Sequence, residues 1–290
     1  MRYVATIGFF DGVHSGHRFV LSELCRVAQE KNLSSMAVSF IHHPRIVLHT
    51  TASDAGFLLT TFTEREHMLE QLVDRVLMLD FAQIHAMTAH EFMCFLHKKY
   101  DIDLLLMGYD HRFGSDMPQT FAEYKQKAKK TGLKLMQMAE YQDDGEHVSS
   151  TTIRRKLLSG DISQANSMLG YSYQLTGKVV AGKQIGRMIG FPTANIEVER
   201  QKLIPMDGVY VVSVEIDDKK YKGILNIGNN PTVGGNERTL EVHVVDFEGE
   251  LYGKNIAISL LSFIREERCF QSVEELKQQI TNDMQNLRDI

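Results

Sequence analysis

The order of strand and helix signals changes near residue 170, and this change most strongly limits the folds open to the chain. Before it, short β-rich runs alternate with segments whose apolar residues recur at helical spacing, as in 4–7 followed by 16–31. Such alternation predicts a parallel sheet with helices on both sides. After it, strand-like runs follow one another with turn residues between them, which is typical of a small antiparallel barrel or sandwich.

We therefore expect two domains, 1–171 and 172–290, in keeping with a length of 290 residues. The strands expected in the first domain are 4–7, 35–40, 75–81, 103–107 and 133–138. Its helices are expected at 16–31, 64–72, 88–97, 121–130, 150–158 and 161–169, with Thr88 and Glu91 forming a capping box. In the second domain we expect strands at 174–180, 208–216, 221–227, 239–247 and 255–262. A last helix starts at Ser272 and Glu275, with Val273, Leu276, Ile280 and Leu287 on its packing face.

Composition excludes several classes of protein. A net charge of -5 gives no basic excess, which argues against a general nucleic-acid or membrane-surface binder. The cysteines Cys25, Cys94 and Cys269 are widely separated, so neither a disulfide framework nor a structural zinc site is expected. No run approaches the ~20 apolar residues of a spanning helix, and the first residues lack a signal-peptide pattern. We expect a cytoplasmic protein that is a monomer or a weak homo-oligomer.

The segment 8–17, which reads G-F-F-D-G-V-H-S-G-H, lies where the first strand should turn into the first helix. Glycines allow close backbone approach to a ligand, and the N-terminus of a helix attracts anions. His14 and His17 can donate to phosphate oxygens, which suits nucleotidyl transfer by charge stabilisation. Alternatively, the two histidines cap the helix, face solvent or bind a metal, although no third ligand of the zincin kind is nearby.

Two segments of the second domain carry candidate chemistry. The run 190–195, G-F-P-T-A-N, offers oxygens from Thr193 and Asn195 that suit Mg²⁺, or it is a turn with local side-chain bonds. Strand alternation puts Glu241 and His243 on one face, where an acid at a barrel mouth can accept a proton from a substrate hydroxyl, or is merely solvated. The run 177–183 imitates a Walker A loop, but Gln184 replaces the Ser or Thr that holds Mg²⁺, so we reject that motif.

The segment 8–17 resembles the H-x-G-H signature of the nucleotidyltransferase superfamily, in the wording of prokaryotic FAD synthetases. Segments 39–44, 108–114 and 149–154 resemble three further motifs of that family, in the same order. The resemblance implies a Rossmann-like domain in which His14, His17 and Arg154 are catalytic. It implies ATP and phosphate contacts from Gly8, Phe10, Asp11, Gly16, Ser150 and Thr151, and flavin contacts from His43, Gly108, Asp110 and Phe113. Departures at His42, His111 and 115–119 fall on the flavin side.

The segment 182–195 resembles the riboflavin kinase signature G-x-x-x-G-x-x-x-G-F-P-T-A-N. Matching pieces follow at 208–210, 226–228, 231–232, 241–243, 246–247, 251–253 and 265–267. The resemblance implies a six-stranded Greek-key barrel with a C-terminal helix. In it, Thr193 and Asn195 bind Mg²⁺ and ATP phosphate, Gly182 and Gly190 contact ATP, Glu241 is the base, and Tyr210 and Arg265 contact flavin.

Together the two resemblances predict a bifunctional enzyme. It phosphorylates riboflavin with ATP to FMN and then joins FMN to AMP from a second ATP, releasing pyrophosphate and FAD. Its partners are riboflavin, FMN, ATP and Mg²⁺, with no nucleic acid and no membrane. One rival keeps the kinase beside a weak or altered N-terminal domain, and another is a flavin-binding regulatory protein without turnover.

Overall fold

The computed structural model describes residues 1–48, 57–108, 111–138, 148–182, 186, 190–232, 235–285 and 287. Its contacts divide the chain into two compact units. The first is Met1–Asp54 with Leu58–Ser150, and the second is Ala55–Phe57 with Thr151–Ile290. The contacts therefore place the segment after Ser150 with the barrel, whereas the domain limits at 171 and 172 stay a prediction about where the two activities reside.

The first unit contains a five-stranded parallel sheet in the order β3-β2-β1-β4-β5. The strands are β1 (Tyr3–Ile7), β2 (Ser34–Phe40), β3 (Arg75–Leu79), β4 (Ile102–Met107) and β5 (Lys134–Gln137). All of β1 is buried, because apolar residues point to both faces of a sheet that is covered on both sides.

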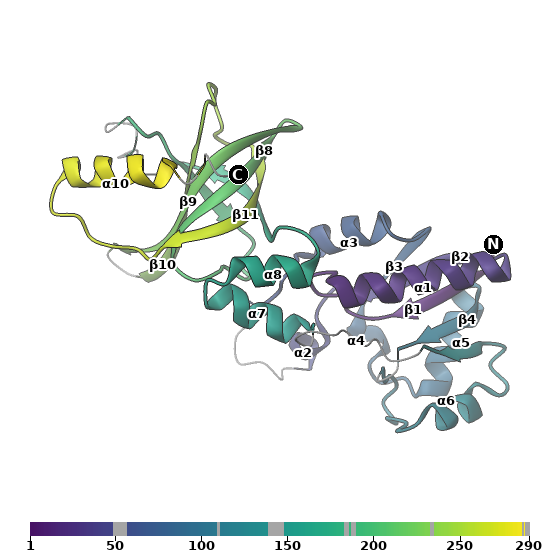
Figure 1. Ribbon diagram of the computed structural model, residues 1–290. Helices are drawn as coiled ribbons and strands as arrows, with labels where there is room; N and C mark the ends of the chain where they lie inside the picture. The colour runs from purple at the N-terminus through teal and green to yellow at the C-terminus, as the bar shows by residue number, and fades with distance from the viewer. Residues whose placement is uncertain are drawn as a thin grey trace. The chain divides into compact units, whose positions relative to one another are not determined.

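Helices cover both faces of this sheet (Figure 1). On one face, α1 (Ser15–Lys31) and α3 (Phe62–Glu70) share a core with Val4 and Leu104. On the other, α4 (Phe81–Ile84), α5 (Ala89–Tyr100) and α6 (Phe121–Ala128) share a core with Ala5 and Leu105. A short helix, α2 (Pro44–Val47), follows β2. The capping box of Thr88 and Glu91 is confirmed at the start of α5.

The second unit is built on a closed barrel in the order β10-β7-β6-β11-β8-β9, with every pairing antiparallel. Its elements are α7 (Ser150–Leu158), α8 (Ile162–Leu169), β6 (Gln174–Val180), β7 (Ala194–Val198), β8 (Gly208–Ile216), β9 (Lys219–Thr232), β10 (Gly235–Val244), β11 (Asn255–Arg265) and α10 (Val273–Gln285). The expected fold class, a Rossmann-like parallel sheet followed by a six-stranded barrel with a terminal helix, is confirmed.

The outer face of the barrel carries Glu241, and the packing of α10 differs from the expectation at Val273. Leu240, Val242 and Val244 are buried along β10, so Glu241 lies on the alternate, outward face and not in the barrel interior. Val273, expected on the packing face of the last helix, is 50% exposed. It lies in the first turn of α10, whereas the barrel is contacted by Met284 near the end of the helix and by Leu287 beyond it.

None of the helices in the described part of the chain is both long enough and apolar enough to span a membrane.

Candidate active sites

The loop between β1 and α1 has an unusual backbone that the core holds in place. Phe10 and Val13 adopt positive φ values of 57° and 37°, although neither is glycine. Their side chains are 4% and 0% exposed and pack with the core beneath α1. Phe10, expected near ATP, therefore contributes only its backbone to the loop surface.

Several carbonyl oxygens of this loop are occupied by donors from the protein. The Phe9 carbonyl accepts from Ser39 Oγ at 3.0 Å, and the Val13 carbonyl accepts from Arg18 Nε at 3.1 Å. The Asp11 carbonyl accepts from Ser150 Oγ at 3.0 Å, and Ser150 is the last residue of the first unit. Ser150, expected to close over the phosphates, is thus brought to the loop by the structure.

His14 and His17 stack on each other at the start of α1, with ring centroids 3.6 Å apart. His14 is the N-cap residue, its side chain makes no capping bond, and the first turn contains no acidic residue. The positive end of this helix therefore keeps its attraction for an anion. Gly16 lies in the same turn, and a Cβ there would come 3.3 Å from the His14 ring.

Burial lowers the pKa of His17 well below 6.5, and the neighbouring His14 lowers it further. The Nδ1 atom of His17 is buried and has no hydrogen-bond partner among the described residues. A neutral ring results, one that a bound phosphate would convert toward the charged form because an anion favours imidazolium.

Thr151 and Arg154 lie on α7 in the second unit. Arg154 donates through Nε to the Phe57 carbonyl at 2.8 Å, and its guanidinium lies 4.2 Å from the centre of the Phe57 ring. Their expected closure over the phosphates involves both units and stays a prediction.

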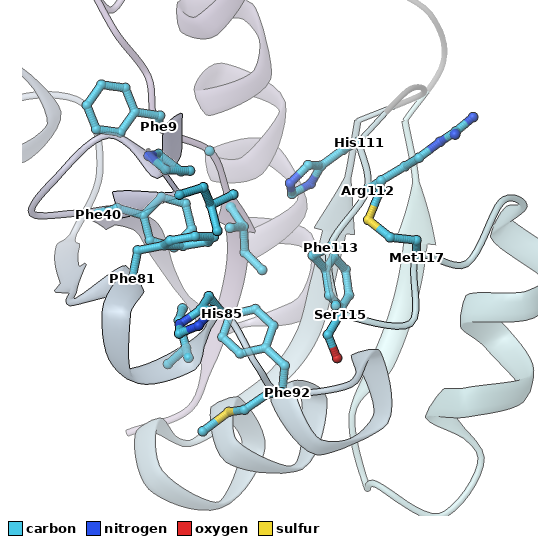
Figure 2. Close-up of a pocket in the computed structure, with 17 residues that line it drawn as sticks. Phe9, Phe40, Phe81, His85, Phe92, His111, Arg112, Phe113, Ser115 and Met117 are labelled. Atoms are coloured by element: carbon cyan, nitrogen blue, oxygen red, sulfur yellow. The ribbon is translucent and has the colours of Figure 1, made fainter. Parts of the chain in front are cut away.

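A cavity of about 470 Å³ opens at the carboxyl end of the parallel sheet (Figure 2). Aromatic side chains dominate its wall, and such rings can stack on a planar heterocycle. Figure 2 shows Phe40 and Phe81 on one side and Phe113 facing them from the other. The rings in the wall are Phe9, Phe40, Phe81, Phe92, Phe113, His85 and His111. In parallel α/β sheets this edge is where ligands bind.

Most of these aromatic residues were missed by the sequence reasoning. Phe40 and Phe81 were the last residues of the expected strands 35–40 and 75–81, but the second strand ends at Leu79 and Phe81 begins α4. Phe92 lies in α5, and its approach to the cavity depends on packing. The fully buried Arg65 lies behind the cavity wall and contacts both Phe9 and Phe40. Its guanidinium lies 4.0 Å from the centre of the Phe9 ring, and its Nη2 donates to the Phe40 carbonyl at 2.7 Å.

The residues of this unit that were expected to contact flavin differ in where the structure places them. Phe113 lines the cavity, and its N–H and carbonyl are both bonded to the Tyr124 hydroxyl, at 2.7 and 2.8 Å. His43 packs edge-on against Phe9 with centroids 4.4 Å apart, and Gly108 follows β4. Asp110 lies outside the described residues.

Segment 115–119, which departs from the expected motif, forms part of the rim of the cavity and is bonded to the neighbouring chain. Ser115 donates through Oγ to the Ala86 carbonyl at 3.0 Å, and Asp116 accepts from Ala89 N–H at 2.7 Å. Asp116 also pairs with Lys127 at 2.7 Å. His111, Ser115 and Met117 line the cavity, so positions at which the sequence departs from the expected signature lie in its wall.

The barrel unit brings Thr193 and Glu241 together. Thr193 Oγ1 lies 3.5 Å from Glu241 Oε2, and Glu241 is the cross-strand partner of Asn195. His243 donates through Nδ1 to the Pro192 carbonyl at 2.8 Å, which fixes the 190–195 loop on β10, since a carbonyl can only accept. Residues that the sequence separates widely are thus gathered at one place.

Two glycines of the expected ATP loop have clear structural reasons. A Cβ at Gly182 would lie 1.9 Å from Asn195 Nδ2, so a larger residue there would displace the Asn195 side chain from its present position. Gly190 turns the chain with φ 88°. Both therefore shape the loop that carries Thr193 and Asn195.

Two cavities meet at Thr193. One, of about 280 Å³, is bounded by Glu241, Arg265 and the α10 residues Leu276 and Ile280. The other, of about 410 Å³, is bounded by Pro192, Phe247 and Tyr252. Thr193 lines both cavities, so a group transferred between their occupants would pass its hydroxyl.

Arg265 and Tyr210, both expected at the flavin, are placed differently from each other. Arg265 lines the smaller cavity, but its guanidinium is bonded to Asp283 of α10, with Nη2 and Oδ2 2.7 Å apart. Tyr210 is fully buried, packs against Phe263 and donates to the Met206 carbonyl. Burial raises the pKa of Tyr210, and its placement gives no support to a flavin contact.

The fold and these sites define a two-unit nucleotide-using transferase, with a nucleotidyltransferase-like α/β unit and a kinase-like barrel. Comparison with protein families agrees with both halves. The FAD synthetase family model matches residues 1–152, and the riboflavin kinase family model matches residues 169–290. The chain belongs to the bifunctional riboflavin kinase/FMN adenylyltransferase family.

Curated relatives extend over nearly the whole chain. The bifunctional riboflavin kinase/FMN adenylyltransferase of Escherichia coli K12 is 37% identical over 290 residues, covering 99% of this chain and 92% of the relative. The enzyme of that name from Pseudomonas fluorescens is 36% identical, covering 97% and 90%. A crystal structure from Streptococcus pneumoniae, described as a macrolide-efflux protein, has a TM-score of 0.90 and 32% identity, covering 100% of this chain and 95% of that one.

Proposed function

We propose that this chain makes FMN from riboflavin in its barrel unit and FAD from FMN in its α/β unit, using ATP in both reactions. The observation that carries the proposal is that each half matched by a family model has its own site, with the signature residues next to a cavity. A cytoplasmic enzyme that acts as a monomer or weak oligomer on small molecules remains part of this proposal.

In the barrel unit, riboflavin occupies the cavity under α10 and ATP occupies the cavity beside Phe247. Glu241 accepts the proton of the riboflavin 5′-hydroxyl, whose oxygen bonds to the γ-phosphorus of ATP as the bond to ADP breaks. The position of Thr193 between the cavities supports this arrangement, because its hydroxyl can orient the transferred phosphoryl group.

The same residues fit a magnesium ion. Thr193 and Asn195 offer uncharged oxygens beside the Glu241 carboxylate, and hard oxygen donors together with substrate phosphates are what Mg²⁺ requires. No cluster of three or more His, Cys, Asp or Glu ligands occurs among the described residues, so a dedicated all-protein cage is not part of the proposal. When bound, the ion would neutralise charge on the ATP phosphates.

In the α/β unit, FMN places its ring in the aromatic cavity and its phosphate toward α1. A phosphate oxygen of FMN bonds to the α-phosphorus of ATP, and pyrophosphate leaves. The N-terminus of α1, with His14 and His17, stabilises the charge that develops. We propose that Ser150, Thr151 and Arg154 complete this anion site.

Paired substitutions test the assignment of the two sites. We expect Glu241→Gln to lower riboflavin phosphorylation about 10²- to 10⁴-fold while FAD formation from added FMN continues. We expect His14→Asn to lower FAD formation about 10²- to 10³-fold while riboflavin phosphorylation continues.

Each variant is the control for the other, because both are measured in the two assays. Loss of both activities in either variant would contradict separate sites. Wild-type protein that binds flavin but converts neither riboflavin nor FMN would favour the regulatory alternative.

A further inference from the structure

Thr60 lies 48 residues from Gly12 in sequence, yet its hydroxyl is part of the loop between β1 and α1. The side chain is buried, with the residue 2% exposed. Gly12 N–H donates to Thr60 Oγ1 at 3.0 Å, and Thr60 Oγ1 lies 3.3 Å from Asp11 Oδ1, to which it donates. One hydroxyl thus links a backbone donor and a side-chain acceptor of the same loop.

The Asp11 carboxylate is enclosed by the same segment. It accepts from Leu59 N–H at 2.9 Å and from Thr60 N–H at 3.1 Å, and Asp11 is 3% exposed. Buried carboxylates require such partners, since an unpaired charge in the interior is costly. Because donors of the protein surround the Asp11 carboxylate, its negative charge does not face an anionic ligand.

The loop needs this support because its backbone is strained. Phe10 and Val13 have φ values of 57° and 37°, whereas Gly12 adopts its φ of 80° without steric cost because it has no Cβ. Sparsely populated conformations persist only where surrounding contacts determine them. His14 follows directly as the N-cap of α1, so any relaxation of residues 10–13 displaces the first turn of that helix.

We propose that Thr60 is a positioning residue for the nucleotide phosphates of the adenylyltransferase site, acting through Asp11 and Gly12. The inference rests on the proposed function of the α/β unit. Thr60 lies outside every signature segment. Its hydroxyl makes the bonds to Gly12 and Asp11, and an apolar side chain at this position could not make them. Serine keeps the hydroxyl, whereas valine keeps the shape and removes it.

Thr61 provides a matched control in the adjacent position. It is 8% exposed, and its side chain accepts from Glu64 N–H in the capping box of α3. Thr61→Val therefore makes the same chemical change in the same segment and weakens the start of α3, while the bridge to the loop stays intact.

The experiment uses the full chain with Thr60→Val, Thr60→Ser and Thr61→Val. FAD formation from FMN and ATP is measured as kcat and as KM for each substrate, and riboflavin phosphorylation in the same preparation is the internal control. We expect Thr60→Val to lower kcat for FAD formation about 10- to 100-fold, as misplacement of a reacting group does, with KM for FMN changed less than about 2-fold. Thr60→Ser and Thr61→Val should retain kcat within about 3-fold.

Equal losses in Thr60→Val and Thr61→Val, or no rescue by serine, would show a merely structural role and overturn the inference. Wild-type protein that forms no FAD would instead remove the proposed function itself. If Thr60→Val does not fold, Thr60→Ala takes its place in the same assays, with Thr60→Ser as the rescue. A kcat for FAD formation that stays within about 3-fold of wild type in Thr60→Ala would overturn the inference.

Discussion

The charge at the start of α1 in the α/β site depends on the stack of His14 on His17. Two neutral imidazoles can share this geometry, whereas two imidazolium rings at 3.6 Å would repel each other. Burial lowers the pKa of His17, with His14 contributing in the same direction. In the ligand-free site His17 is therefore neutral near pH 7. A bound anion would favour its protonated, positively charged form.

This shift gives a pH dependence of stability with a definite sign. Between the lowered folded pKa of His17 and its unfolded value near 6.5, the unfolded chain binds more protons, so stability increases with pH across that window. We expect the ligand-free α/β unit to lose stability as pH falls from 7.5 to 5.5. One proton allows at most about 1.4 kcal/mol per pH unit.

Amide exchange of α1 in the full chain at pH 7.5, 6.5 and 5.5 measures this loss, corrected for intrinsic exchange. His17→Asn removes the titrating ring and is the control. The same pH dependence in wild type and in His17→Asn would show that another group is responsible.

At the scale of elements, α10 owes its position to one buried ion pair and a small apolar contact. Asp283 has a side-chain exposure of 3% and pairs with Arg265 at the end of β11, and Gln279 donates to the same carboxylate at 2.7 Å. Leu287 packs on Val209 and Ile224 of the barrel. The helix side of the smaller barrel cavity therefore depends on this attachment.

Asp283→Asn should loosen that side of the cavity. It leaves a largely buried guanidinium without its charge partner, which costs about 3–5 kcal/mol when a buried pair is broken. We expect KM for riboflavin to rise about 10-fold, with a smaller change in kcat, because ground-state binding is what the helix supplies.

Steady-state kinetics and thermal unfolding of this variant test the idea. Asp217→Asn is the matched control, since Asp217 pairs with Lys254 but has a side-chain exposure of 70%. Equal effects of the two substitutions, or an unchanged KM in Asp283→Asn, would contradict the role given to α10.

Elements with strong local signals could be predicted from sequence, and those created by pairing could not. The start of α10 was predicted from Ser272 and Glu275, and Ser272 Oγ accepts from Glu275 N–H at 3.1 Å. By contrast, β7 was not predicted as a strand, because its first residues belong to the Pro-Thr-Ala-Asn run that resembles a turn. Its extended form comes from pairing with β6 and β10.

The same distinction holds for the sites. His14, Thr193 and Glu241 stand in signature segments and could be found from sequence. Thr60, Arg65 and Phe81 could not, since each carries no motif and acts only where tertiary packing brings it to a loop or a cavity wall.

At the scale of the whole molecule, the chain contains two compact units, each with its own core and its own cavities. FMN is the product of one proposed site and the substrate of the other. Both sites must therefore work in the same chain and in a fixed chemical order, with His111 and Ser115 lining the cavity proposed for the flavin of the second reaction.

The most direct test is a time course of purified full-length protein with riboflavin, ATP and Mg²⁺, in which chromatography separates riboflavin, FMN and FAD. We expect FMN to rise first and FAD to follow as FMN falls. FMN that accumulates without FAD would contradict the activity assigned to the α/β unit, and the absence of FMN would contradict the activity assigned to the barrel.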